Sequence, residues 1–306
     1  MKYFVLPIIL LLSISKNSTL FAKCKIPQLG EDQVTSFRRE AISKFKERWT
    51  IQLNGPIGTY SVKATVYPPH QKKFLGLNRS AKTYSDHMIL FPTINGEGLL
   101  ENKVAKYFAR HDYWVVIPTI DEINFKYDQQ TTCQMDQMFR RVQQSAVTLF
   151  DKLVSISPNG RKFLIGASQG GIRTITSASI IPDLEAMWAN VAGGDFPSVY
   201  ARSNVDQIEE FRHRHMASLN LTNSDQYESY LRESLTFDPA QTCLKRNGRL
   251  AMVVALEDSS VPTYNQKFLE DACSPEQVRY LKSGHVRGVI DLWLKRRTVR
   301  EFLENI

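Results

Sequence analysis

The segment from Lys162 to Gly171 constrains the fold more than any other stretch of this chain. An apolar run typical of a strand leads directly into Gly166-Ala-Ser168-Gln-Gly170, and a helix-forming segment follows. A serine at such a turn has a strained backbone and a hydroxyl directed away from the sheet, and the two glycines remove side chains that would collide there. The segment therefore predicts a strand, a sharp turn and a helix, with Ser168 presented at the turn.

An acid and a histidine follow in loops of a similar kind. The apolar run at residues 250–256 predicts a strand that ends just before Asp258, and residues 277–282 predict a strand that ends just before His285. Asp195 also follows a predicted strand and is the alternative acid. We expect folding to gather the serine, acid and histidine loops at one edge of the sheet.

The chain order Ser168, Asp258, His285 resembles the α/β-hydrolase superfamily, whose triads run serine, acid, histidine. The setting Asp-x-x-Val-Pro at Asp258 is also typical of that family, which favours Asp258 over Asp195. The resemblance implies an α/β fold with a mostly parallel, doubly wound sheet, and a serine hydrolase in which the histidine takes the serine proton while the carboxylate holds the imidazole. Gly-x-Ser-Gln-Gly-Gly recurs in several carboxylesterase and acetylesterase groups, which favours an ester substrate.

The resemblance further implies two backbone N–H donors that stabilise the oxyanion of the intermediate. Gln169, directly after the serine, would supply one of them. The other donor comes from the loop after the predicted strand at residues 86–91, where Ile94 is the candidate and Thr93 the alternative. This sequence departs from the family pattern here, because Pro92 and Thr93 stand where many members have His-Gly.

The rest of the chain predicts alternating strands and helices. Residues 50–53 and 60–67 alternate as an opening hairpin, residues 133–153 have helical spacing, and residues 185–193 predict the strand after the serine helix. Between residues 195 and 243 the sequence becomes polar and helix-prone, with dispersed aromatic residues. The resemblance implies a helical cap insertion at this place, which would shape the substrate pocket; helices packed on the flank of the sheet are the alternative.

The amino terminus resembles a secretory signal. An apolar run at residues 3–14 follows Lys2 and leads to Ala22, where a signal peptidase could cut. We therefore expect residues 1–22 to be removed and residues 23–306 to form one exported α/β-hydrolase domain, periplasmic or secreted. The run is too short to span a bilayer comfortably, so no stable membrane span is expected after cleavage; an uncleaved anchor is the alternative.

Export places four cysteines in a compartment where disulfides form. We expect Cys243 to pair with Cys273, because both flank the segment that carries the predicted acid strand. Cys24 would then pair with Cys133. Other pairings, and four free thiols, are the alternatives.

Charge and residue spacing bear on the partners. The net charge of +8 falls to +6 when Lys2 and Lys16 are removed with the signal, so an anionic surface is a candidate partner. No basic stripe with interleaved aromatic residues indicates nucleic-acid binding. His213 and His215 lie two apart and would diverge on a helix, and no CxxC pair is present, so we expect neither a metal nor another cofactor.

The sequence thus predicts an exported serine hydrolase that cleaves an ester or a related acyl bond through an acyl-serine. A serine peptidase or amidase on the same fold is the first alternative, since the same three side chains serve either leaving group. A non-catalytic α/β-hydrolase used as a binding module is the second. The acyl-chain preference and the oligomeric state do not follow from these patterns.

Overall fold

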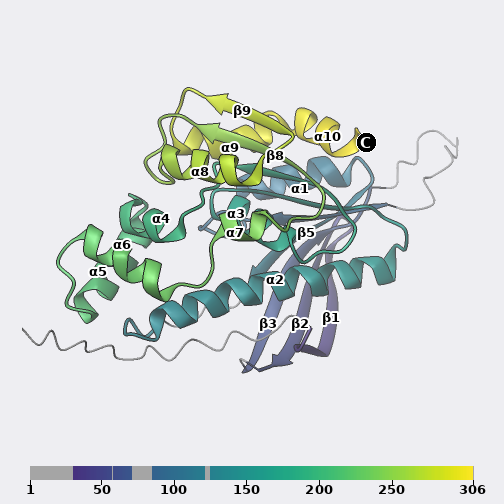
Figure 1. Ribbon diagram of the computed structural model, residues 1–306. Coiled ribbons are helices and arrows are strands. Elements are labelled where there is room, and N and C mark those ends of the chain that lie inside the picture. Colours follow the sequence, from purple (N-terminus) through teal and green to yellow (C-terminus); the bar gives the residue numbers. More distant parts are fainter. Residues whose placement is uncertain (1–29, 57, 71–84, 121–124, 306) are drawn as a thin grey trace, which may run out of the picture.

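The computed structural model describes residues 30–56, 58–70, 85–120 and 125–305. In these residues nine strands form one sheet (Figure 1). The strands are β1 (Gln33–Ser43), β2 (Lys46–Gly55), β3 (Gly58–Tyr67), β4 (Asp86–Phe91), β5 (Tyr113–Ile120), β6 (Lys162–Ala167), β7 (Leu184–Asn190), β8 (Arg249–Ala255) and β9 (Gln277–Leu281). The predicted signal at residues 1–22 lies outside the described residues.

The sheet is mostly parallel, as the sequence predicts. Its strand order is β1-β2-β3-β5-β4-β6-β7-β8-β9. The first three strands are antiparallel to their neighbours, and β3 is antiparallel to β5. All pairs from β5 to β9 are parallel. The predicted opening hairpin is confirmed by the pairing of β2 with β3, whereas β1, an exposed edge strand, was not predicted.

Helices cover both faces of the sheet (Figure 1). They are α1 (Leu99–Ala109), α2 (Thr131–Ile156), α3 (Gln169–Ala178), α4 (Phe196–Arg202), α5 (Asp206–Ser218), α6 (Ser224–Ser234), α7 (Pro239–Cys243), α8 (Thr263–Cys273), α9 (His285–Leu294) and α10 (Arg296–Glu304). Along β6, Phe163 and Ile165 pack in the core with α1, α9 and α10, while Leu164 between them packs in the core with α2, α3 and α8. This alternation places β6 between two helical layers.

Residues 195–243 hold helices α4 to α7. Tyr227 and Leu231 of α6 form a small separate core with Ala201 of α4, and α4, α5 and α6 lie to one side of the layered body (Figure 1). By contrast, α7 packs against α3 and α8 in the main body. None of the helices in the described ranges is both long and apolar enough to cross a membrane.

A disulfide joins Cys243 at the end of α7 to Cys273 at the end of α8, with their Cα atoms 5.3 Å apart. This is the predicted pairing. The segment that it closes contains β8, Asp258 and most of α8. Cys24 lies outside the described residues, so its pairing with Cys133 stays a prediction.

Candidate active site

Ser168 occupies a strained turn between β6 and α3. Its backbone has φ 56° and ψ −126°, a conformation that residues with a side chain seldom adopt. A Cβ atom at Gly166 would lie 2.3 Å from the carbonyl oxygen of Gly170, and one at Gly170 would lie 2.2 Å from that of Phe91. The turn therefore requires glycine at both positions, as the sequence predicts.

The structure brings Ser168, Asp258 and His285 together. The strands β6, β7, β8 and β9 are parallel neighbours, so the loops at their carboxyl ends lie along one edge of the sheet. His285, the first residue of α9, has its Nδ1 2.7 Å from Oδ2 of Asp258 and its Nε2 2.9 Å from Oγ of Ser168. These two hydrogen bonds link the side chains of three loops into one continuous chain.

Asp258 accepts hydrogen bonds from other residues besides His285. Its side chain is fully buried, and its Oδ1 accepts backbone N–H groups from Ser260 at 2.8 Å and Val261 at 3.0 Å. Its Oδ2 accepts from Nε2 of Gln266 at 2.8 Å as well as from His285. Four donors fix the orientation of this carboxylate, so it can accept a hydrogen bond from a proton on Nδ1 of the imidazole.

That arrangement leaves Nε2 of His285 as the hydrogen-bond acceptor for the Ser168 hydroxyl. We assign this tautomer from the partners, because the Asp258 oxygen accepts from Nδ1–H while Nε2 is left to accept from the serine hydroxyl. An imidazole held in this way can take the serine proton as the hydroxyl oxygen attacks an electrophile. The site can therefore perform nucleophilic chemistry.

Two backbone amides near Ser168 are free to donate. In the described part of the chain, neither the Gln169 N–H nor the Ile94 N–H has a hydrogen-bond acceptor. The N–H of Thr93, the alternative candidate, instead points to Oε1 of Glu101 at 3.4 Å, and Pro92 has no N–H. The close approach of Gly170 to the Phe91 carbonyl holds this loop against α3. The geometry favours Gln169 and Ile94 as the donor pair.

No protein-family model matches this chain, and no curated protein matches it by sequence. Its structure is similar to that of an acetyl xylan esterase from Paenibacillus sp. R4, with a TM-score of 0.61 at 14% identity over 91% of this chain and 89% of that chain. Acetyl xylan esterase 1 from Thermoanaerobacterium sp. JW/SL YS485 gives a TM-score of 0.57 at 14% identity over 85% and 89%. A puromycin-hydrolyzing peptidase of Mycobacterium tuberculosis gives 0.55 at 16% identity over 84% of this chain but 39% of that chain.

This chain has the α/β-hydrolase fold. The other polar residues considered for the site from the sequence bind partners outside the Ser168, His285 and Asp258 group. Asp195, the alternative acid, forms an ion pair with Arg232 at 2.7 Å, so its carboxylate is bound to α6. His215 is fully buried between Tyr227 and the carbonyl of Asp128. Across the described ranges, no cluster of three or more His, Cys, Asp or Glu residues could hold a metal ion.

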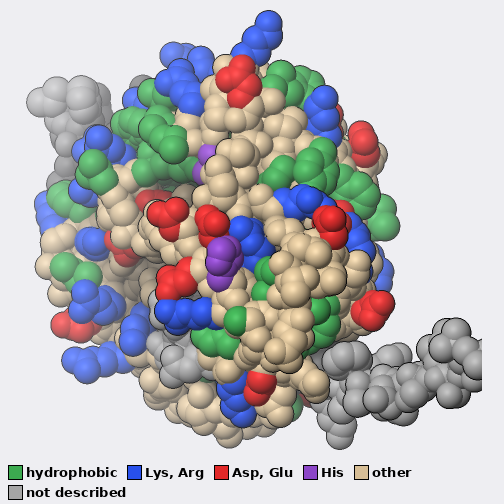
Figure 2. Space-filling model, turned by 90° about the vertical axis from the view of Figure 1, so that its left-hand side faces the viewer, with side chains coloured by type: hydrophobic (Ala, Val, Ile, Leu, Met, Phe, Trp, Pro, Cys, Tyr) green, Lys and Arg blue, Asp and Glu red, His purple; other side chains and the backbone are tan. Residues whose placement is uncertain are grey.

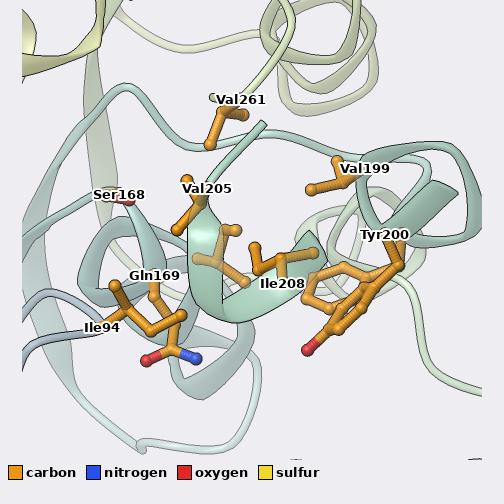
Figure 3. Close-up of a pocket in the computed structure, with 10 residues that line it drawn as sticks. Ile94, Ser168, Gln169, Val199, Tyr200, Val205, Ile208 and Val261 are labelled. Carbon is orange, nitrogen blue, oxygen red and sulfur yellow. The ribbon is translucent and has the colours of Figure 1, made fainter. Parts of the chain in front are cut away.

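An apolar pocket opens beside Ser168, with about 420 Å³ of space that is partly open to solvent. Gln169 and Ile94 lie next to the serine, while α4 and α5 supply the opposite wall (Figure 3). Half of the lining comes from the predicted cap: Phe196, Val199, Tyr200, Val205 and Ile208. The segment after Asp195 therefore shapes the space in which a substrate of Ser168 would lie.

The outer side of α4 and α6 is charged. Arg202 of α4 pairs with Asp225 at 2.6 Å and with Glu228 at 3.0 Å, and Arg232 pairs with the same Glu228 at 2.6 Å. Basic and acidic side chains are intermixed over this face of the molecule (Figure 2). Helix α4 thus presents charge to solvent and apolar side chains to the pocket, and α6 adds to the charged outer face.

Sequence reasoning missed Gln266 and Arg173. Gln266 on α8 is fully buried and donates to Asp258, yet a glutamine one turn into a helix carries no local signal of that role. Arg173 follows the serine turn on α3 and resembles any polar residue on a helix surface.

Proposed function

We propose that this protein is an exported serine hydrolase that cleaves a carboxylic ester through an acyl-serine. The observation that supports it most is the hydrogen-bonded chain Ser168, His285, Asp258, with 2.9 Å and 2.7 Å between successive partners. A backbone of φ 56° at the serine is a further support, since strain of this kind persists where it presents a reactive group. The fold that this chain shares with esterases is consistent with the proposal.

In the first half of the reaction, Oγ of Ser168 attacks the ester carbonyl carbon while Nε2 of His285 takes the hydroxyl proton. The negative charge then resides on the former carbonyl oxygen, and the N–H groups of Gln169 and Ile94 donate to it. When the intermediate collapses, the bond to the alcohol oxygen breaks and the imidazolium returns its proton to that oxygen. Asp258 stabilises the imidazolium and does not take the proton itself.

In the second half, water replaces the alcohol. Nε2 of His285 takes a proton from the water as its oxygen attacks the acyl-serine, and the proton then passes to Oγ of Ser168 as the carboxylic acid leaves. The helices at residues 196–208 cover the pocket, so we propose that residues 195–243 act as the cap that excludes bulk water and sets the acyl or alcohol preference.

Export is the second part of the proposal. The apolar segment at residues 3–14 supports a signal that is cleaved after Ala22. The disulfide between Cys243 and Cys273 fits an oxidising compartment.

A fluorophosphonate probe tests the nucleophile. We expect it to label the wild type and the Ser155→Ala control, in which an exposed serine of α2 is removed, but not Ser168→Ala. Absence of wild-type labelling, or equal labelling of Ser168→Ala, would contradict the hydrolase proposal and favour a non-catalytic binding module. A panel of p-nitrophenyl esters beside aminoacyl anilides then separates an esterase from a peptidase or amidase. A higher kcat/KM for the anilides would overturn the ester assignment.

A further inference from the structure

Solvent reaches α3 on one side only. Every residue of this helix is buried except Gln169 and Arg173, which lie four positions apart and therefore share a side of the helix. Gln169 lines the pocket beside Ser168. Arg173 is not among the residues that line the pocket; it lies one helical turn beyond Gln169 on the same side of α3, farther along the helix from the serine.

Two other polar side chains, those of Gln169 and Tyr200, lie near this side of α3. The side-chain amide of Gln169 points away from Ser168, and the hydroxyl of Tyr200 lies across the pocket from the serine (Figure 3). Tyr200 of α4 is half-buried and interacts electrostatically with Arg173. Burial raises the pKa of Tyr200 to about 12, so this group is a neutral hydroxyl donor at ordinary pH.

In the part of the chain that the structure describes, the charge of Arg173 has no partner of opposite sign. Among the described residues, no carboxylate forms an ion pair with Arg173 and its guanidinium donates no hydrogen bond. Burial lowers its pKa to about 10, which still leaves it protonated at neutral pH. A partly buried cation without an anion is unfavourable in the free protein, because lost hydration is not replaced.

Other partly buried arginines of this chain differ from Arg173 in this respect. Arg161 pairs with Asp86 at 2.7 Å, and Arg279 pairs with Asp291 at 2.6 Å. Both of these arginines join elements of the fold. Arg173 forms no ion pair with any described residue, so its charge is available to a ligand that enters beside Ser168.

We propose that Arg173 and Tyr200 form a carboxylate-binding subsite at the end of the pocket farther from Ser168, so that the preferred ester carries a carboxylate on the part that extends there. The planar guanidinium can donate two parallel N–H bonds to a carboxylate, and the phenol can add a third. This inference rests on the proposed esterase function for its consequence, which is selectivity for anionic esters.

Matched esters test the selectivity, with the charge on either side of the scissile bond. On the acyl side, we compare the mono-4-nitrophenyl ester of adipate with its analogue whose distal carboxylate is a carboxamide. On the alcohol side, we compare 4-acetoxybenzoate with 4-acetoxybenzamide. In one of the two pairs, Arg173→Gln should lower kcat/KM for the carboxylate ester about 10- to 100-fold while it changes the carboxamide ester less than about twofold. The affected pair identifies the side of the ester that carries the charge.

The control is Arg297→Gln, which removes the same charge from an arginine that is 82% exposed on α10. It should leave the ratio of the two kcat/KM values unchanged in both pairs. Equal losses for charged and neutral esters in Arg173→Gln, or no loss in either pair, would overturn the subsite. The melting temperature of Arg173→Gln should equal or exceed that of the wild type, because the substitution removes an unpaired, half-buried cation.

A binding measurement separates this proposal from the proposed function. In the Ser168→Ala background, adipate should raise the melting temperature and adipamide should not, and the added Arg173→Gln substitution should abolish the increase. Such binding in a protein that hydrolyses no ester would leave the subsite standing and the esterase proposal wrong. Ester hydrolysis with neither adipate binding nor charge selectivity would leave the esterase proposal standing and the subsite wrong.

Discussion

Gln266 donates a side-chain N–H to Oδ2 of Asp258 at 2.8 Å, the same oxygen that accepts from His285. Its Nε2 also donates to the carbonyl of Val261 at 2.7 Å, and its Oε1 accepts from the Ala255 N–H at 3.0 Å. One buried amide therefore ties the end of β8 and the loop after it to the carboxylate. Gln266 acts as a positioning residue for Asp258.

Replacing this amide should affect turnover more than binding. We expect Gln266→Met, which keeps the side-chain length but not the donors, to lower kcat about 10- to 100-fold with KM within about twofold, because Asp258 loses a donor that fixes its orientation. Asn265→Ala is the matched control, since Asn265 is equally buried on α8 but bonds to the carbonyl of Gly194. It should lower stability without the selective loss of kcat. Similar kinetics in the two variants would mean that Gln266 is only structural.

The two candidate acids should respond differently to the same substitution. Asp258→Asn should lower kcat about 10⁴-fold, because an amide cannot stabilise the imidazolium and favours the wrong tautomer. Asp195→Asn should leave kcat nearly unchanged, because Asp195 pairs with Arg232 and not with His285. Steady-state kinetics on p-nitrophenyl acetate makes the comparison. A larger effect at Asp195 would reverse the assignment of the acid.

Gly170 links the serine turn to the loop that carries Ile94. A Cβ atom there would lie 2.2 Å from the carbonyl oxygen of Phe91, so Gly170→Ala should push that loop away and cost about 1 to 3 kcal/mol of stability. If the Ile94 amide then leaves the oxyanion position, kcat should fall about 10²- to 10³-fold. In the control Gly98→Ala, the nearest atom is a flexible carboxylate oxygen of Glu101 at 3.2 Å. Melting temperature and kcat should both stay near wild type there, and comparable losses in the two variants would contradict the argument.

Much of the site could be predicted because its signals are local. The strands β6, β8 and β9 are short runs bounded by glycine, acidic or serine residues, and the observed bounds of β8 and β9 lie within one residue of the predicted 250–256 and 277–282. A strand end and the polar residue just after it are adjacent in sequence. The parallel order of the strands then determines that Ser168 and His285 meet.

The parts that were missed depend on contacts between distant residues. β1 has exposed side chains throughout, so no buried face imposes a period of two, and it is a strand because its backbone pairs with β2. Gln266 is buried because the loop of Asp258 folds over it. Arg173 differs from a surface arginine only in what surrounds it, which includes Tyr200 from a segment 27 residues away. Periodicity carries no information on such pairs.

The disulfide between Cys243 and Cys273 should stabilise the part of the molecule that holds the acid. The two cysteines are 30 residues apart, and a cross-link of this span contributes about 3 to 4 kcal/mol by restricting the unfolded chain. Cys243→Ser with Cys273→Ser should therefore lower the melting temperature and shorten the half-life of activity on heating. The value of kcat at 25 °C should not change, because neither sulfur touches the site. An unchanged melting temperature would show that the cross-link adds no stability.

His215 should make the protein less stable in mild acid. Burial lowers its pKa to about 4 from the ordinary 6.5, and its neutral ring accepts from the Tyr227 hydroxyl while Nε2–H donates to the carbonyl of Asp128. The unfolded chain binds a proton at this histidine more readily than the folded one between these two pH values. The contribution of His215 to the free energy of unfolding is therefore fully present above pH 6.5, and it falls by up to about 3 kcal/mol as the pH approaches 4.

Paired histidine variants isolate this contribution. His215→Gln removes the buried titration, so its free energy of unfolding, measured in urea at a series of pH values, should decline less than that of the wild type between pH 6.5 and about 4. His213→Gln removes a histidine two positions away that is 68% exposed, and its stability should follow the wild-type curve. The hydrogen-exchange protection factors of the α5 and α6 amides should fall before those of the other helices as the pH is lowered, since His215 joins these two helices. Parallel curves for His215→Gln and wild type would show that this histidine does not link pH to stability.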